Sequence, residues 1–314
     1  MLNVRNDYLV ILVATNNRLE LLKRTINSIA TGTHCSHEII VIDGGSTDGT
    51  IEYLNSHQGI TPVYQGELFG TALSYNLVWR QVESKYTCWL SDDTEIVPGS
   101  LDLAVSILEA DPEIGMVGLK MKDTVGPGKT EPYMGSLSTY GVLNCNHGVL
   151  PMDLLMSVGY FNEGYRSYMI DPDLTASVLC TGNKVVMTKR ISILHHREWS
   201  EGVDWHKKIK HEMGGIDNRK IYYEKFRFLQ NSLSPSVQLK KRFGNSVGRF
   251  LFNGSSESFI RCKLNRRDWI NLFGGHFIRL SDPLRTINLP YHLLQQIPLH
   301  LLKIGTNPYR YLVE

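Results

Sequence analysis

The chain lacks the sequence features of a secreted or membrane-spanning protein. No apolar run approaches the roughly 20 residues that a membrane-crossing helix needs, and no charged-then-apolar secretory leader begins the sequence. The cysteines are odd in number, widely spaced and free of any Cys-x-x-Cys pair, which argues against a disulfide framework and a thiolate zinc site. They are Cys35, Cys88, Cys145, Cys180 and Cys262. We therefore expect a cytoplasmic protein.

The common nucleotide-binding fingerprints are also absent. The stretch EIIVIDGGSTDGT, residues 38–50, contains neither G-x-G-x-x-G nor G-x-x-x-x-G-K-[ST]. Its strand ends on a carboxylate, Asp43, where a phosphate cradle would need backbone N–H groups and a lysine. The loop is therefore neither of the common nucleotide-binding fingerprints, and the role of Asp43 has to be inferred from the rest of the chain.

The net charge of +2 hides an asymmetry along the chain. From Lys240 to Glu314 there are 12 Lys and Arg against 4 Asp and Glu, a surplus of eight positive charges, so the remainder carries six negative ones. This basic tail could meet an anionic surface, either membrane or nucleic acid. Its segment RCKLNRRDWINLFGGHFIRL is either an amphipathic membrane-surface segment or part of a small helical domain that packs on the rest. Because it matches no nucleic-acid motif, we expect no nucleic-acid partner.

Strand and helix patterns alternate over the first 120 residues. Strands are expected at 9–14, 38–42, 86–90 and 115–121, and helices at 18–30, from about 47, near 71–83 and from Pro98. This alternation predicts an α/β fold with a doubly wound, mostly parallel sheet. Ligands bind at the carboxyl ends of such strands, so the acidic loops at Asp43 and Asp92–Asp93 should face one crevice.

The alternation stops near residue 200. Mixed helical patterns broken by proline and glycine follow, and we place a boundary near 205–235. The expected organisation is a catalytic domain over residues 1–210 and a basic, mainly helical region over 211–314, which either contacts a membrane or the acceptor or packs on the catalytic domain.

Three polar clusters stand at the ends of elements. Asp92, Asp93 and Glu95 follow a hydrophobic strand, and such oxygen ligands suit Mg²⁺ or Mn²⁺, although a solvated turn before a helix would look the same. Asp171 precedes Pro172, which fits a helix N-cap as well as a general base. His195 ends the strand-like run ISILHH and is either structural or a ligand for a divalent ion.

Taken together, these motifs resemble the inverting nucleotide-sugar glycosyltransferases of family 2, which have the GT-A fold. The match runs from about Tyr8 to His196, and the motifs occur in the family's order. ILVATNNR resembles the opening strand and turn, VIDGGSTDGT the V-D-[ND]-x-S-x-D-x-T loop, and CWLSDDTEIVPGSL the metal motif. GTALSYN resembles the helix after the third strand, GYFNEGY the G-G-F-D-E-x-F segment, and IDPDL the E-D-x-D-L segment that supplies the base.

The resemblance implies a role for each motif residue. The nucleotide would contact Thr15, Asn17, Arg18, Asp43, Asn76 and Asp92. A divalent metal, Mn²⁺ or Mg²⁺, would be held by Asp93, with Glu95 and His195. The catalytic base would be Asp171, and Asp173 is the alternative because Ile170 replaces the acid that usually precedes the base.

The implied reaction moves a sugar of hexosyl or deoxyhexosyl class from a UDP, GDP or dTDP donor to a glycan or lipid-linked acceptor. The segment 195–208, with Arg197 and Trp199, either closes over the diphosphate or is an exposed loop. Two rival functions are a sugar-nucleotide nucleotidyltransferase and a non-catalytic carbohydrate-binding protein. The first would favour a Gly-rich, Arg- or Lys-bearing loop after the first strand, of which ATNNR offers little. The second would require loss of the acids, which are all present.

Overall fold

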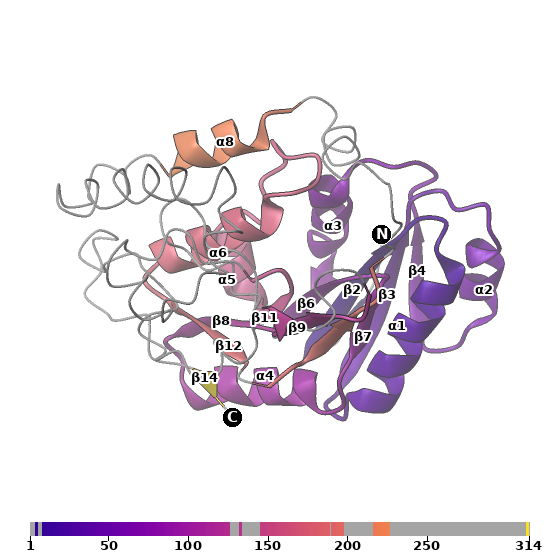
Figure 1. Cartoon of the computed structure of the whole chain (residues 1–314), viewed down its shortest axis with the longest axis horizontal. Helices are drawn as coiled ribbons and strands as arrows, with labels where there is room; N and C mark the ends of the chain where they lie inside the picture. The colour runs from indigo at the N-terminus through magenta and orange to yellow at the C-terminus, as the bar shows by residue number, and fades with distance from the viewer. Residues whose placement is uncertain are drawn as a thin grey trace, which may run out of the picture.

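A computed structural model describes residues 8–125, 145–188, 190–197 and 216–226, together with the backbone of 4–5, 132–133 and 312–313. Its main sheet has eight strands in the order β14-β12-β8-β11-β6-β2-β3-β4 (Figure 1). In chain order these are β2 (Leu9–Thr15), β3 (His37–Asp43), β4 (Ile60–Tyr64), β6 (Tyr86–Ser91), β8 (Ile114–Gly118), β11 (Gly148–Pro151), β12 (Lys184–Thr188) and β14 (Leu312–Val313). Only β11 runs antiparallel to its neighbours, so the sheet is mixed and mostly parallel, as predicted.

A second, four-stranded sheet has the order β10-β9-β13-β7. Its strands are β7 (Thr94–Ile96), β9 (Met121–Asp123), β10 (Pro132–Tyr133) and β13 (Ile193–His195), and a separate parallel pair joins β1 (Val4–Arg5) to β5 (Val82–Glu83). Because β7 follows β6 and β9 follows β8, this small sheet begins where strands of the main sheet end. It therefore brings the segments after β6, β8 and β12 together at one edge.

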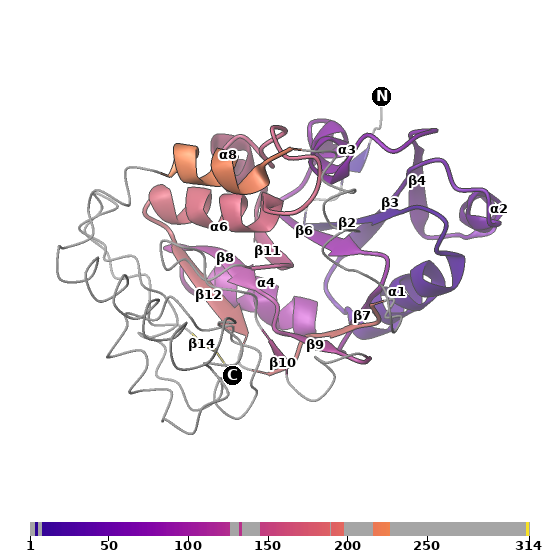
Figure 2. The same ribbon diagram turned by 45° about the horizontal axis from the view of Figure 1, so that its top comes forward.

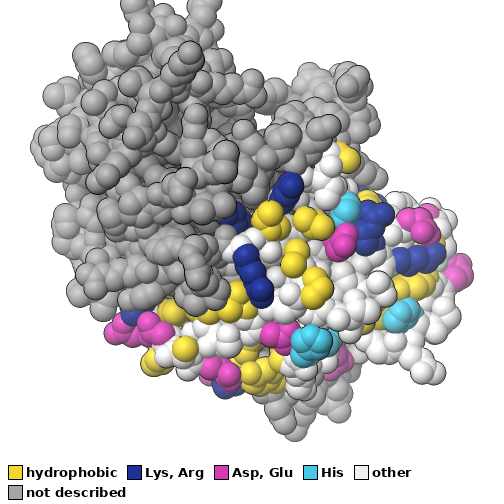
Figure 3. Space-filling view, turned by 60° about the horizontal axis from the view of Figure 1, so that its bottom comes forward, with side chains coloured by type: hydrophobic (Ala, Val, Ile, Leu, Met, Phe, Trp, Pro, Cys, Tyr) yellow, Lys and Arg dark blue, Asp and Glu magenta, His cyan; other side chains and the backbone are white. Residues whose placement is uncertain are grey.

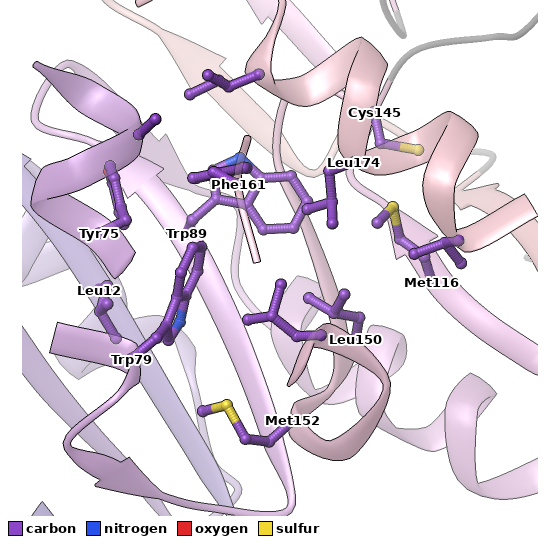
Figure 4. Packing of buried hydrophobic residues seen from close by; sticks show 14 of the residues in the cluster. Leu12, Tyr75, Trp79, Trp89, Met116, Cys145, Leu150, Met152, Phe161 and Leu174 are labelled. Atoms are coloured by element: carbon purple, nitrogen blue, oxygen red, sulfur yellow. The ribbon is translucent and has the colours of Figure 1, made fainter. Parts of the chain in front are cut away.

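Helices cover both faces of the main sheet, as Figures 1 and 2 show. They are α1 (Leu19–Gly32), α2 (Thr50–Ser56), α3 (Thr71–Trp79), α4 (Ser100–Ala110), α5 (Met152–Ser157), α6 (Ile170–Cys180) and α8 (Asn218–Lys225). One core joins the sheet to α1, α2 and α4, and the other joins it to α3, α5, α6 and α8. In the second core Phe161 packs edge-on against Trp89 and Tyr75, and Figure 4 shows Leu174 of α6 on its far side.

Several expected boundaries need correction. The predicted strand at 115–121 is two strands in different sheets, because the chain leaves the main sheet at Leu119. The helix expected from residue 47 begins at Thr50, since Asp48 accepts hydrogen bonds from the Thr50 amide and hydroxyl. Pro98 does not open a helix: Gly99 adopts a left-handed conformation after it and α4 begins at Ser100.

The helix that carries the predicted base also begins earlier than expected. Its N-cap is Met169, in a left-handed conformation with φ 74°, and Asp171 is the second residue of α6. Asp171 is therefore not an N-cap, which removes the purely structural role that the sequence allowed it. A left-handed non-glycine residue costs of order 1–3 kcal/mol and commonly marks a functional site.

Most of the region expected as a basic helical extension, residues 211–314, lies outside the described residues, as do Trp199 and the rest of 198–208. The exceptions are β14 and residues 216–226, where α8 packs Tyr222 and Phe226 into the second core. In the part of the chain that the structure describes, no helix is long and apolar enough to cross a membrane.

Candidate active site

Asp43, at the carboxyl end of β3, holds the loop that follows it. Its carboxylate accepts hydrogen bonds from the amides of Gly45 at 3.0 Å and Ser46 at 3.1 Å, and the residue is fully buried. Gly45 has φ +83°, and a Cβ there would lie 2.3 Å from the carbonyl oxygen of Gly66. The loop therefore needs glycine at this position, and the carboxylate keeps acceptor capacity beyond the two amides.

Asp92 and Asp93 follow β6 and share one guanidinium. Arg18 lies 3.1 Å from Asp92 and 3.5 Å from Asp93, and Thr15 donates a 2.8 Å hydrogen bond to Asp92. Burial raises the pKa of Asp92 to about 6, although the charge of Arg18 opposes the rise. Strand β2 and the start of α1 thus place two predicted nucleotide contacts, Thr15 and Arg18, directly on the acidic pair.

His195, at the end of β13, lies between two carboxylates. Its Nε2 is 3.3 Å from Asp93 Oδ2, and its Nδ1 is 2.8 Å from Asp123 Oδ1. Burial alone would lower the pKa of His195, but the hydrogen bonds to Asp123 and Asp93 outweigh it and raise the pKa to about 9. Burial alone would raise the pKa of Asp93, but His195, Ser91 and Arg18 together outweigh it and lower the pKa of Asp93 well below its usual value.

The third predicted metal ligand, Glu95, does not join this pair. Its carboxylate binds His196 Nε2 at 2.6 Å, and in the register of β7 and β13 it lies opposite Leu194 rather than His195. Within the described residues, no three His, Cys, Asp or Glu side chains are grouped as a metal site. The structure therefore brings together two of the three expected ligands.

Asp93 and His195 nevertheless fit a divalent cation whose other ligands come from a substrate. Two adjacent ligands at about 2.1 Å from an octahedral ion lie about 3.0 Å apart, close to the 3.3 Å between Asp93 Oδ2 and His195 Nε2. Mg²⁺ is usually bound by one or two protein carboxylates plus phosphates, not by an all-protein cage. A carboxylate with an imidazole suits Mn²⁺ equally.

The two candidate bases on α6 differ in their surroundings. Asp173 is 1% exposed and accepts hydrogen bonds from Tyr165 at 2.8 Å and Ser177 at 3.3 Å. It also forms an ion pair with Lys225. No side chain of a described residue hydrogen-bonds to the Asp171 carboxylate, and burial raises the pKa of Asp171 to about 7. Of these two carboxylates, Asp171 is thus the one with available lone pairs and a raised pKa.

The segment 145–147 connects the helix that carries the candidate base Asp171 to the acidic pair. The Cys145 amide donates to the Thr175 hydroxyl one turn beyond Asp171, and two residues later His147 Nε2 lies 3.5 Å from Ser91 Oγ. Ser91 in turn donates a 2.5 Å hydrogen bond to Asp93. The segment 145–147 therefore contacts both the first turns of α6 and the end of β6.

Two other predicted nucleotide contacts have structural partners. Asn76 is fully buried on α3, where it exchanges hydrogen bonds with the backbone of Phe161 and donates to Glu163. Its surroundings do not support nucleotide contact. Asn17 has φ 54° and binds the Thr47 amide at 2.7 Å, so it fixes the loop after β3 to the turn after β2.

Sequence reasoning missed Asp123 and His147. Asp123 follows the strand GMVGLKM much as Asp43 and Asp92 follow theirs, so the strand-end acid pattern could have identified it. His147 had no such signal, because β11 was not predicted. Its Nδ1 lies 3.1 Å from the Trp89 carbonyl, and burial lowers the pKa of His147 to about 4, so it is neutral.

Comparison with known proteins identifies relatives of one kind. The sequence model of the family described as "Glycosyl transferase family 2" matches residues 10–162. A Rickettsia conorii protein described as an uncharacterized glycosyltransferase is 27% identical over 183 residues, which are 52% of this chain and 29% of that protein. One from Nostoc is 24% identical over 112 residues, 34% of each chain. The chain thus spans about a third of the length of these relatives.

Solved structures show the fold. Residues 1–349 of S. aureus TarS match with a TM-score of 0.53 at 19% identity, over 94% of this chain and 87% of that one. A longer TarS structure matches with a TM-score of 0.54 at 17% identity, over 94% of this chain and 52% of that one. The expected GT-A architecture, a mostly parallel sheet flanked by helices, is confirmed.

Proposed function

We propose that this chain, whose residues 10–162 match the model of glycosyltransferase family 2, transfers a sugar from a nucleoside-diphosphate donor to an acceptor hydroxyl, with inversion at the anomeric carbon. The observation that carries this proposal is the state of Asp171: a carboxylate without side-chain partners among the described residues, with its pKa raised by burial to about 7. A general base works best when its pKa lies near the working pH.

The donor binds along the carboxyl ends of β2, β3 and β6. Asp43 and Asp92 accept hydrogen bonds from N–H and O–H groups of the nucleoside, because an ionised carboxylate is a hydrogen-bond acceptor and never a donor. Arg18 bridges Asp92 and Asp93 and thereby holds the two acids side by side. We expect a UDP, GDP or dTDP donor and a hexosyl or deoxyhexosyl group.

Asp93 and His195 would hold the divalent cation, Mn²⁺ or Mg²⁺. When bound, this ion neutralises charge that builds up on the leaving diphosphate, a contribution worth several kcal/mol. Ser91 fixes Asp93 through its 2.5 Å hydrogen bond, so one carboxylate oxygen is anchored and the other faces His195.

Asp171 removes the proton from the acceptor hydroxyl while the oxygen of that hydroxyl bonds to the anomeric carbon. The bond from that carbon to the diphosphate oxygen breaks on the opposite face of the sugar. Asp173 takes no part in proton transfer, because its lone pairs are used by Tyr165, Ser177 and Lys225. The acceptor is a glycan or lipid-linked saccharide of surface polysaccharide assembly, and the basic tail brings the enzyme to an anionic membrane surface.

Nucleotide binding tests this proposal directly. The melting temperature of the full chain is measured with UDP, GDP, CDP and dTDP, each with and without Mn²⁺, for wild type, Asp93→Ala and Asp153→Ala. Asp153 is an exposed acid on α5 and serves as the matched control. We expect one nucleotide to raise the melting temperature in a Mn²⁺-dependent way, with the shift lost only in Asp93→Ala.

Release of that nucleoside diphosphate from its sugar conjugate, followed by NMR of the product anomer, then tests transfer and inversion. A chain that none of the four nucleotides stabilises would instead be a non-catalytic member on the same fold. The same melting-temperature measurement with the four corresponding nucleoside triphosphates tests the rival function, because a larger shift with a triphosphate than with its diphosphate would favour a nucleotidyltransferase.

A further inference from the structure

Two neighbouring strands hold His195 from opposite sides. In the small sheet β13 lies between β7 and β9, and His195 is the register partner of Thr94 on one side and Asp123 on the other. Since Asp93 immediately precedes β7, the two imidazole nitrogens contact carboxylates from two different strand ends. The orientation of the ring is thus fixed by the sheet itself.

Asp123 contacts the imidazole of His195 more closely than Asp93 does. The carboxylate is 4% exposed, and its Oδ1 lies 2.8 Å from His195 Nδ1. Its Oδ2 faces Arg197 Nε at 3.8 Å, and the Arg197 side chain is 41% exposed. His195 is therefore the principal partner of this buried acid.

The hydrogen bond determines which ring nitrogen can bind a metal. An imidazole that donates its Nδ1 proton to a carboxylate presents a lone pair on Nε2, and this arrangement also raises the basicity of the ligand. In this site Nε2 faces Asp93 Oδ2, the other expected ligand. We propose that Asp123 is a positioning residue of the divalent-metal site, which holds His195 in the tautomer and orientation that bind the ion through Nε2.

This inference rests on the proposed function, because it requires a metal between Asp93 and His195. It goes beyond that function by assigning a role to a residue that contacts neither metal nor substrate. Carboxylates that orient a metal-binding histidine typically contribute 10- to 100-fold in metal affinity. A carboxylate that served only to neutralise Arg197 would contribute nothing to that affinity.

The test measures Mn²⁺ binding without any reaction. Free Mn²⁺ is followed by electron paramagnetic resonance during titration of the full chain with Mn²⁺ alone and with UDP, GDP, CDP or dTDP. The variants are Asp123→Asn, which keeps an acceptor for Nδ1 without the charge, and Asp123→Ala, which removes both. Asp111→Asn is the matched control, because it breaks a comparable ion pair, the 2.8 Å contact with Lys184. This pair lies at the start of β8 and β12, at the opposite end of these strands from Asp123.

We expect Mn²⁺ affinity to fall about 10- to 100-fold in Asp123→Ala and by less in Asp123→Asn, with no change in Asp111→Asn. The KM for Mn²⁺ should rise in both Asp123 variants while kcat at saturating Mn²⁺ stays near wild type. Circular dichroism and the melting temperature confirm that each variant folds. Asp123→Asn, which changes no volume, keeps the test valid if Asp123→Ala unfolds.

The two modes of failure are distinct. If wild type takes up Mn²⁺ and both Asp123 variants bind it equally well, the role of Asp123 is overturned and the proposed function stands. If wild type takes up no Mn²⁺ with any of the four nucleotides, the metal-assisted mechanism fails and this inference fails with it.

Discussion

Two carboxylates on α6 show how surroundings decide the role of a residue. Asp171 and Asp173 are separated by one proline, yet Asp173 is fixed by Tyr165, Ser177 and Lys225 whereas Asp171 has no such partner among the described residues. A buried acid with its hydrogen bonds satisfied stabilises the fold, and one with its lone pairs available can accept a proton. The IDPDL motif alone could not separate these roles, because they depend on groups up to 52 residues away.

Asp171→Asn should lower kcat by ~10²- to 10⁴-fold, because general-base assistance contributes about that much to the rate. Donor binding, measured by the nucleotide-dependent rise in melting temperature, should stay near wild type. The matched control is Asp153→Asn, at an exposed position on α5. Transfer by Asp171→Asn at the wild-type rate would show that another group is the base.

The pH dependence of wild type follows from the same group. Burial raises the pKa of Asp171 to about 7, so kcat should fall about tenfold per pH unit below pH 7, where the base is protonated.

The folded state binds this proton more tightly than the unfolded chain does, so the contribution of Asp171 to stability falls as pH rises from about 4 to 7. Asp171→Asn should therefore be more stable than wild type at pH 8, by on the order of 1 to 3 kcal/mol in urea unfolding. A pH–stability curve identical to that of wild type would contradict the assignment of this pKa.

Asp173→Asn should show the opposite pattern. The substitution keeps the shape of the side chain but removes the charge that pairs with Lys225, and the loss should cost about 1–3 kcal/mol of unfolding free energy. Specific activity of the folded fraction should remain within a few-fold of wild type. A large loss of activity at unchanged stability would place Asp173 in the reaction.

At the scale of elements, helix α1 supports the turn that carries Asp92 and Asp93. The Thr25 hydroxyl is fully buried and lies 2.8 Å from the Asp92 carbonyl and 2.5 Å from the Thr94 carbonyl. One turn on, Ser28 accepts a 2.9 Å hydrogen bond from the Ile96 amide. The helix thereby ties down the backbone between β6 and β7 on the face opposite α3.

Thr25→Val should disturb the acidic turn without touching either acid. Valine fills the same volume but leaves two buried carbonyls without their donor, so unfolding free energy should fall by about 1–3 kcal/mol. Mn²⁺-dependent nucleotide binding should weaken as well, because Asp93 moves with the turn. Thr31→Val, at an exposed position on the same helix, is the control. Nucleotide affinity equal to wild type would show that the turn holds its shape without the helix.

The elements that the sequence predicted well are those with uninterrupted apolar runs. LVILVA and EIIVI form central strands that are buried except at Ala14 and Glu38, and both occur within a residue or two of their expected bounds. Strands β7, β9 and β11 were missed or merged, because each is only three or four residues long and pairs with strands distant in sequence. The same long-range pairing places Asp123 beside His195, which explains why the sequence alone pointed to Asp93 and His195 but not to Asp123.

At the scale of the whole molecule, the site lies where three chain segments meet. Residues near 15–18, 91–95 and 193–196 converge at the small sheet, and residues 145–147 connect them to α6. The ordered set of motifs predicted this convergence, because the carboxyl ends of parallel strands share one edge. The partner of each side chain could not be predicted, since a change of one residue in register would exchange His195 for His196.

Charge is distributed unevenly over the whole chain. On the face shown in Figure 3, acidic and basic side chains of the described residues lie interspersed, whereas the sequence from Lys240 to Glu314 carries a surplus of eight positive charges. Basic residues near an anionic bilayer contribute about 1 kcal/mol each. An enzyme that uses a lipid-linked acceptor would gain from such attraction.

The full chain should therefore float with vesicles of phosphatidylcholine and phosphatidylglycerol, but not with phosphatidylcholine alone, and high salt should release it because salt screens exposed charges. Replacing Arg266 and Arg267 with glutamine should weaken binding about thirtyfold, the equivalent of about 2 kcal/mol. The matched control replaces Lys23 and Lys220, two exposed lysines in the described part of the chain. Equal binding to neutral vesicles would show an apolar contact instead. No flotation with either lipid would assign the basic tail to an acidic partner or to the enzyme's own acidic surface.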